Sequence, residues 1–248
     1  LKRKRLNLAA QKNMKKHIPN LFTLANLTCG ILATICLIKT HDFELAAYLV
    51  LAGALFDFFD GFIARLLGVS GELGKQLDSL ADMVTFGLVP GLIGFSLCEE
   101  FYSASSGAYA WMIYIPLIIT LMSAMRLAIF NISTDQSDSF IGVPTPANAL
   151  FWIGLPFLLK YIEVGDIYTV ILLSILSAVL LVFKYKMLSL KFKTFGLKGN
   201  HGRWLLVIAS AAAFVTLTII TGNPLISLPI IIILYLIISV INNSLSKT

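Results

Sequence analysis

The chain of 248 residues is 58% hydrophobic and only 13% charged, and its formal net charge is +6. A soluble domain carries about 25% charged residues, so this composition excludes an ordinary soluble protein. The apolar runs are long and continuous, which excludes a β-barrel pattern and predicts an all-α polytopic membrane protein. Membrane topology accounts for the positive charge, so we expect no nucleic-acid partner.

Apolar runs predict a bundle of about eight transmembrane helices. In chain order they cover about 19–38, 44–66, 78–98, 111–132, 147–162, 166–184, 204–221 and 224–242. We expect residues 19–184 to form a six-helix core. A basic segment (1–18) precedes the core, a basic loop (185–203) follows it, and two further helices and a tail occupy 204–248.

Charge predicts the orientation of these helices. All 19 Lys and Arg residues except Lys39 and Lys160 lie in alternate connections, in the two terminal segments or at the adjoining helix ends. Basic residues collect on the cytoplasmic side of a membrane protein. We therefore expect a multi-pass protein of the cell membrane with both termini in the cytoplasm, and with the 67–77 connection on that side.

Four aspartates fall at Asp57, Asp60, Asp78 and Asp82, within or at the edge of the second and third predicted spans. Carboxylates are costly in hydrocarbon, so they need a partner or a function. Asp57 and Asp60 share a helix face with Ala64, and Asp78 and Asp82 share a face of the next helix. The short connection makes these helices antiparallel neighbours, so we expect the four carboxylates to converge.

Carboxylate oxygens in this number suit Mg²⁺, Mn²⁺ or Ca²⁺, and a pair of such ions can clamp a diphosphate. Gly61 and Gly74 leave room for a ligand, and Arg65 offers a forked donor to phosphate. Two other interpretations remain open. The carboxylates can pair structurally with Arg65 and Lys75, although these are two cations against four acids, or they can line the cation pathway of a transporter.

The spacing of these residues resembles the signature of the CDP-alcohol phosphotransferases, D-x2-D-G-x2-A-R-x8-G-x3-D-x3-D. Its eight fixed positions are Asp57, Asp60, Gly61, Ala64, Arg65, Gly74, Asp78 and Asp82. The resemblance covers about residues 19–184. It implies an enzyme that cleaves a CDP-linked lipid: a hydroxyl attacks the phosphorus distal to the cytidine, and CMP leaves.

The resemblance also implies roles for individual residues. Asp57, Asp60, Asp78 and Asp82 would bind two Mg²⁺ or Mn²⁺ ions, with no organic cofactor, and Asp82 would be the catalytic base. The CDP moiety would contact Asn20, Thr23, Asp57, Gly61, Ala64, Arg65 and Gly74. Of these, Asn20 and Thr23 belong to a short P-N-x-x-T element, for which an ordinary helix start with Asn20 as its cap is an equal alternative.

Three further stretches resemble the serine-using branch of the family, the membrane-embedded phosphatidylserine synthases. They are 79–90, 126–131 and 140–147. The resemblance implies that CDP-diacylglycerol and L-serine are the substrates. The residues placed near the serine are Arg126, Asn131, Phe86, Gly87 and Pro144. Arg126 suits this role because a guanidinium binds a carboxylate bidentately.

Alternatives remain for the acceptor. Ile129 stands where this branch commonly has a second arginine, and glycerol 3-phosphate or inositol phosphate would suit the same chemistry. Arg126 could instead pair with Asp135, Asp138 or a lipid phosphate, and the loop at Pro144 could be only a rigid turn. Membrane lipids and a second copy of the chain are the other partners that we expect.

Overall fold

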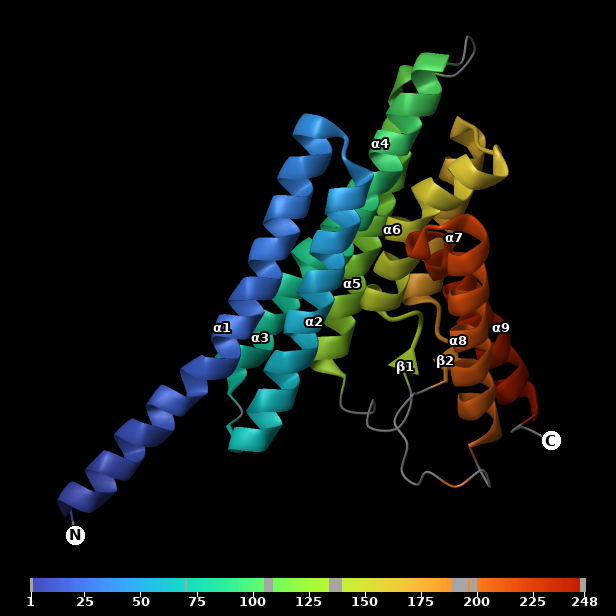
Figure 1. The fold of residues 1–248 in the computed structure, drawn as a ribbon. Helices are drawn as coiled ribbons and strands as arrows, with labels where there is room; N and C mark the ends of the chain where they lie inside the picture. Colours follow the sequence, from blue (N-terminus) through green and yellow to red (C-terminus); the bar gives the residue numbers. More distant parts are fainter. Residues whose placement is uncertain are drawn as a thin grey trace.

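Helices make up nearly all of the structure, a computed structural model that describes residues 2–69, 71–104, 109–133, 140–188, 196 and 200–245 (Figure 1). The helices are α1 (Lys2–Thr40), α2 (Phe43–Leu67), α3 (Glu72–Asp82), η1 (Met83–Leu88), α4 (Val89–Ala104), η2 (Ala110–Leu117), α5 (Ile118–Ile132), α6 (Thr145–Ile162), α7 (Ile167–Val182), α8 (His201–Thr221), η3 (Pro224–Ile226) and α9 (Ser227–Leu245). The prediction of an all-α polytopic membrane protein is confirmed.

Six helical stretches of the described chain are long and apolar enough to cross a membrane, against about eight predicted. They are His17–Thr40, Phe43–Leu67, Glu72–Tyr102, Ala110–Ile132, His201–Thr221 and Pro224–Ser244. Helices α6 and α7 occupy the other two predicted positions but have only 18 and 16 residues. Helix α6 lies largely inside the bundle, where Trp152 and Ile153 are fully buried, so protein rather than lipid covers most of it.

Two turns set α1, α2 and α3 side by side. The Asp42 side chain accepts a 2.9 Å hydrogen bond from the Leu45 backbone N–H and so caps the start of α2. Gly68 ends α2 in the left-handed conformation at φ 59°, which glycine adopts without strain. Helix α3 already begins at Glu72, six residues before the predicted span, and so extends the helix beyond Asp78 toward the connection.

The third membrane crossing contains a change of helix type. Helices α3 and α4 are joined without a break by η1, a π-helical stretch that starts directly after Asp82. A π-helical turn inserts extra backbone into the helix and is frequent at functional sites. Here it lies against α1 and α5, and its Thr85 and Phe86 side chains are buried.

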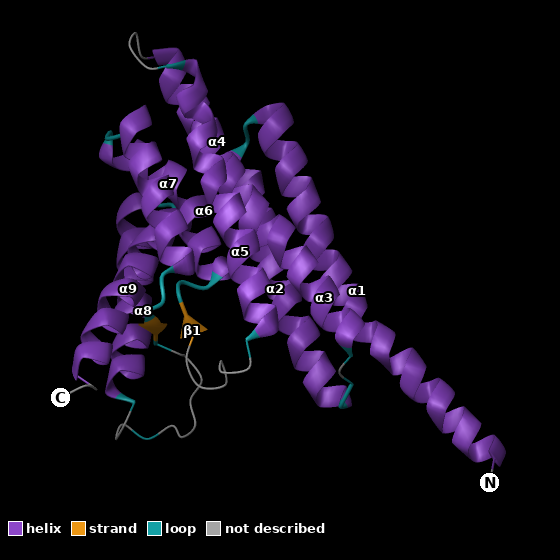
Figure 2. Ribbon diagram, turned by 180° about the vertical axis from the view of Figure 1, so that it is seen from behind, coloured by secondary structure: helices purple, strands orange, loops and turns teal. Residues whose placement is uncertain are grey.

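A two-stranded antiparallel sheet, with two residues in each strand, lies at one end of this otherwise helical bundle. Strand β1 (Phe140–Ile141) pairs with β2 (Lys186–Met187), which joins two connections that we predicted as separate loops. In Figures 1 and 2 this small sheet lies at the end of the bundle where α1 begins and α9 ends. The predicted placement of both termini on one side of the membrane is therefore compatible with the helix arrangement.

Candidate active site

Thr23 of α1 and Asp60 of α2 form the most direct contact between these two helices at the acidic segment. The Thr23 hydroxyl donates a 2.6 Å hydrogen bond to Oδ2 of Asp60, and both side chains are buried. A buried carboxylate needs a donor or a cation to offset its loss of water. Thr23 supplies one donor and leaves the remaining lone pairs of Asp60 available.

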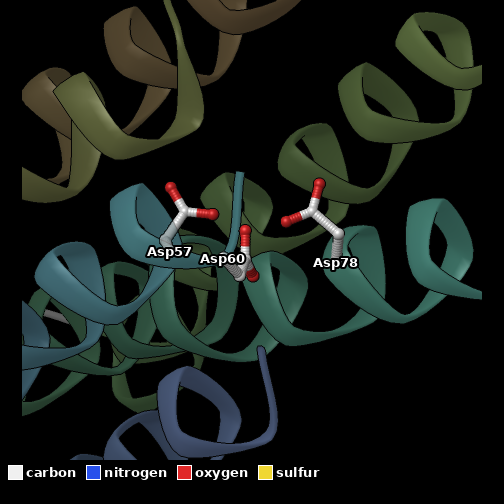
Figure 3. A group of neighbouring side chains, drawn as sticks. All are labelled: Asp57, Asp60 and Asp78. Carbon is white, nitrogen blue, oxygen red and sulfur yellow. The ribbon is translucent and has the colours of Figure 1, made fainter. Parts of the chain in front are cut away.

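Asp57, Asp60 and Asp78 form a cluster of three carboxylates. One oxygen from each lies within 4.8 Å of the other two. Figure 3 shows Asp57 and Asp60 on α2 and Asp78 on α3, with the Asp57 and Asp78 carboxylates directed toward each other. The i, i+3 spacing and the antiparallel neighbour together produce this convergence.

This cluster has the composition of a divalent-cation site. Three like charges at this separation repel strongly in a partly desolvated place. The nearest basic residues in sequence do not offset the charge, since the Lys75 ammonium donates to the Asn131 backbone oxygen at 2.8 Å and Arg65 is exposed. Oxygen-only donors in this number fit Mg²⁺ or Mn²⁺, and nitrogen and sulfur ligands are missing from the described cluster.

Asp82 lies one turn beyond Asp78. Its carboxylate is not one of the three that lie within 4.8 Å of one another, but it is close enough to interact electrostatically with all three. Its Oδ1 accepts a 3.3 Å hydrogen bond from the Asn26 side-chain amide of α1. Asn26 is fully buried, and its backbone oxygen accepts a 3.0 Å hydrogen bond from the Thr85 hydroxyl of η1. The neighbouring helix α1 therefore holds the Asp82 carboxylate beside the cluster.

Asn26 is a residue that we did not predict at the site. It follows Thr23 by three positions and so lies on the same face of α1. That spacing was the available signal, but it points to Asn26 only once α1 is known to pack against α3. Two glycines permit this close packing. A Cβ at Gly30 would lie 2.9 Å from the Thr85 Cα, and one at Gly53 would lie 2.9 Å from the Asn26 Oδ1.

A cavity of about 690 Å³ opens beside the carboxylates. Five of the seven residues predicted to bind CDP line it, together with the Asp60 and Asp78 carboxylates. The five are Asn20, Thr23, Gly61, Ala64 and Gly74. A Cβ at Gly61 would meet nothing within 4 Å, so this glycine leaves open space instead of permitting helix packing. Arg65 and Asp57, the other two predicted residues, do not line this cavity.

The predicted acceptor residues divide into two groups, of which Arg126 stands beside a cavity. Its side chain is 8% exposed, and its Nε has no hydrogen-bond partner among the described residues. It lines a cavity of about 280 Å³ with Ile129, Phe130, Ser133, Leu181, Val182 and Lys184. A buried guanidinium with a free donor is suited to an anionic ligand.

The other predicted acceptor residues do not line the Arg126 cavity. The Asn131 amide donates a 2.9 Å hydrogen bond to the Ser79 hydroxyl and so ties α5 to α3. Phe86 is 1% exposed and packs in the core, and Gly87 abuts the Ser123 Cβ. Pro144 precedes the first residue of α6. Asp135 and Asp138, considered as partners of Arg126, lie outside the described residues.

Comparison with known proteins identifies relatives of this chain. A model of the family described as CDP-alcohol phosphatidyltransferase matches residues 16–240. This match extends through α8 and most of α9, beyond the 19–184 region that carries the sequence motifs.

Three curated relatives illustrate the similarity. CDP-diacylglycerol–serine O-phosphatidyltransferase of Helicobacter pylori is 39% identical over 134 residues, which are 53% of this chain and 54% of that protein. The Bacillus subtilis protein of the same name is 33% identical over 141 residues, 57% of this chain and 76% of the relative. Archaetidylserine synthase of Methanothermobacter thermautotrophicus is 30% identical over 162 residues, 64% and 66% of the two chains. The chain spans about half the length of the Helicobacter relative.

Proposed function

The chain belongs to the CDP-alcohol phosphatidyltransferase family, and from this premise we propose that it transfers the phosphatidyl group of CDP-diacylglycerol to the hydroxyl of L-serine. The products would be phosphatidylserine and CMP. Relatives named for this reaction support the proposal, as does the presence of Arg126 beside a second cavity. The observation that carries it is the 690 Å³ cavity, which joins five predicted CDP residues to two of the clustered carboxylates.

The donor would bind with its diphosphate at the carboxylate cluster and its cytidine in the cavity. Asp57, Asp60 and Asp78 would hold the divalent ions, Mg²⁺ or Mn²⁺, with Asp82 near enough along α3 to contribute to a second ion. Such ions neutralise phosphate charge and polarise phosphoryl oxygens when they are bound. Thr23 fixes the orientation of Asp60 through its 2.6 Å hydrogen bond, and the exposed Arg65, which does not line the cavity, would have to turn toward the phosphates to bind them.

Asp82 would act as the general base. The serine hydroxyl oxygen forms a bond to the phosphorus that carries the diacylglyceryl group, and its proton passes to the Asp82 carboxylate. The bond from that phosphorus to the bridging oxygen breaks, and CMP leaves with the electron pair. Because Asn26 engages Oδ1 of Asp82, the second oxygen is the one that would receive the proton.

Arg126 would bind the serine carboxylate through two parallel hydrogen bonds. The 280 Å³ cavity beside it has room for a group of amino-acid size. Asn131 and Gly87 would act on the acceptor through the packing of α5 against α3 and η1, and Phe86 would support that wall from the core. Pro144 would fix the entry of the chain into α6 beside this region.

We further propose that the protein lies in the cell membrane with this site facing the cytoplasm, where CDP-linked substrates and serine are available. The basic connections and the common end of α1 and α9 support this orientation (Figure 2). The six-helix division at residue 184 and a homodimeric assembly remain parts of the same proposal.

An acceptor panel tests the function. Detergent-solubilised protein would receive CDP-diacylglycerol and Mg²⁺ or Mn²⁺ with L-serine, glycerol 3-phosphate or inositol phosphate, and CMP release would be measured. We expect release with serine and little with the two phosphorylated acceptors. Preferential release with either phosphorylated acceptor would preserve the family chemistry and overturn the assignment of serine.

A further inference from the structure

The last two helices lie far from the family motif in sequence, yet α9 contacts the region of the Arg126 cavity. Helix α9 packs on α6, α8 and strand β2. Three side chains on successive turns of α9 hydrogen-bond the backbone of residues 186–188. In Figures 1 and 2, the sheet of β1 and β2 lies beside α8 and α9 at the same end of the bundle.

Leu188 receives two of these hydrogen bonds. Its backbone oxygen accepts a 3.3 Å hydrogen bond from the Tyr235 hydroxyl, and its backbone N–H donates a 3.3 Å hydrogen bond to the Ser239 Oγ. One turn further along α9, the Asn243 amide donates to the Lys186 backbone oxygen at 3.4 Å. Tyr235 and Ser239 are 8% and 1% exposed, so their hydrogen bonds are protected from water.

The backbone that α9 holds is continuous with one wall of the Arg126 cavity. Leu181, Val182 and Lys184 form this wall, and β2 follows them directly. The wall also carries the 142–143 segment, because Gly142 donates to the Tyr185 backbone oxygen at 2.9 Å and Val143 to the Leu180 backbone oxygen at 3.0 Å.

Gly142 shows how closely these segments are fitted. Its φ is +75°, and a Cβ at this position would lie 2.5 Å from the Leu181 backbone oxygen. Both the conformation and the contact require glycine. Next to the sheet of β1 and β2, Tyr235 and Ile238 of α9 pack with Val143, Met187 and Leu206 in a separate apolar cluster. The wall is therefore fixed by hydrogen bonds on one side and by apolar packing on the other.

We propose that α9 positions the acceptor: Tyr235 and Ser239 hold Leu188, and through it the 181–188 segment stays at the distance from Arg126 that the acceptor requires. This inference rests on the proposed function for the identity of the acceptor. It assigns the C-terminal helices a role in acceptor affinity and none in binding the donor, whose cavity is lined by residues of α1, α2, α3 and the connection between α2 and α3.

Tyr235→Phe is the most informative variant, because it removes the hydroxyl and keeps the buried ring. We expect the serine KM to rise about threefold in Y235F and about tenfold in Y235F/S239A, as the loss of one or two hydrogen bonds implies. The KM for CDP-diacylglycerol should stay near the wild-type value, whereas the thermal midpoint of the double variant should fall slightly, because Leu188 loses both hydrogen-bond partners. Ser244→Ala is the matched control, since that hydroxyl donates to the Val240 backbone oxygen within α9 and not to residues 186–188.

Hydrogen–deuterium exchange of the full-length protein provides a readout that does not depend on turnover. Exchange at 181–188 should increase in Y235F/S239A and remain unchanged in S244A. Unchanged exchange would show that Tyr235 and Ser239 do not hold the 181–188 segment. Increased exchange with an unchanged serine KM would show that this contact has no role in acceptor affinity. If wild-type CMP release does not depend on serine, the proposed function fails instead. Exchange at 181–188 alone then decides whether α9 holds this segment.

Discussion

The donor and acceptor halves of the proposed site are built in different ways. The donor half takes its side chains from α1, α2 and α3, three consecutive helices joined by short turns. The acceptor half brings together Arg126 of α5, the 181–188 segment and Tyr235 of α9, which lie far apart in the sequence, Leu188 and Tyr235 by 47 residues. In the proposed site, the residues assigned to the metal and CDP are thus positioned by local helix spacing, whereas those assigned to the acceptor are brought together by tertiary contacts.

The largest expected effect concerns Asp82, the proposed base, which would act on the acceptor hydroxyl beside the bound donor. Asp82→Asn should lower kcat by about 10²- to 10⁴-fold, because the serine hydroxyl loses its proton acceptor. Binding of CDP-diacylglycerol, measured by isothermal titration with solubilised protein, should change little. Asp42→Asn is the matched control, because Asp42 caps the start of α2, at the end away from Asp57 and Asp60. This variant should retain activity. Retained turnover in D82N would remove Asp82 from its role as base.

The next effect is confined to the donor half. Asp57→Asn should lower kcat/KM by about 100-fold and raise the Mg²⁺ concentration required for activity, because the cluster loses one of its three charged ligands. A titration of CMP release against Mg²⁺ measures both quantities. An unchanged Mg²⁺ requirement would exclude Asp57 as a ligand.

The corresponding test of the acceptor half is Arg126→Gln. Loss of a charged hydrogen-bond pair should raise the serine KM by about 10- to 100-fold and leave the donor KM unchanged. Arg126→Lys keeps the charge but not the forked geometry, so we expect it to recover only part of the affinity. A parallel rise in the donor KM would show that the two halves are not separable at this residue.

The hydroxyl of Thr23 allows a finer test of the donor half. Thr23→Val should weaken metal affinity by about tenfold, because a group that orients a metal ligand is lost while the side-chain volume is kept. Thr28→Val is the control, since the Thr28 hydroxyl bonds only the Leu24 backbone oxygen on the same helix. Equal Mg²⁺ dependence in the two variants would contradict the role of Thr23.

The smallest effects on catalysis come from two glycines of the donor half. Gly30→Ala should reduce stability by about 1–3 kcal/mol, because its Cβ would collide with Thr85. Gly61→Ala should leave the thermal midpoint unchanged and raise the donor KM several-fold, since its Cβ would extend into the open cavity. A lower midpoint in G61A would indicate that Gly61 serves packing instead of ligand access.

The donor half could largely be predicted from the sequence. Helical spacing placed Asp57 and Asp60 on one face, and the short turn placed Asp78 opposite them, because both features are local. The contact of Asp82 with α1 could not be predicted, since it depends on Asn26, whose backbone oxygen accepts a hydrogen bond from Thr85 of the π-helical stretch after Asp82. Likewise, the burial of α6 within the bundle could not be predicted, because a run of apolar residues does not distinguish contact with protein from contact with lipid.

The acceptor half could be predicted only at Arg126. The pairing of β1 with β2 and the contact of Tyr235 with Leu188 join segments that carry no common periodicity. The motif placed Phe86 near the acceptor, but its side chain lies in the apolar core.

The most direct test of the central claim is the product balance of the wild-type protein. With CDP-diacylglycerol, Mg²⁺ or Mn²⁺ and radiolabelled L-serine, each mole of CMP released should be accompanied by one mole of label in a lipid that co-migrates with phosphatidylserine. Release of CMP without incorporation of serine into lipid would contradict the account.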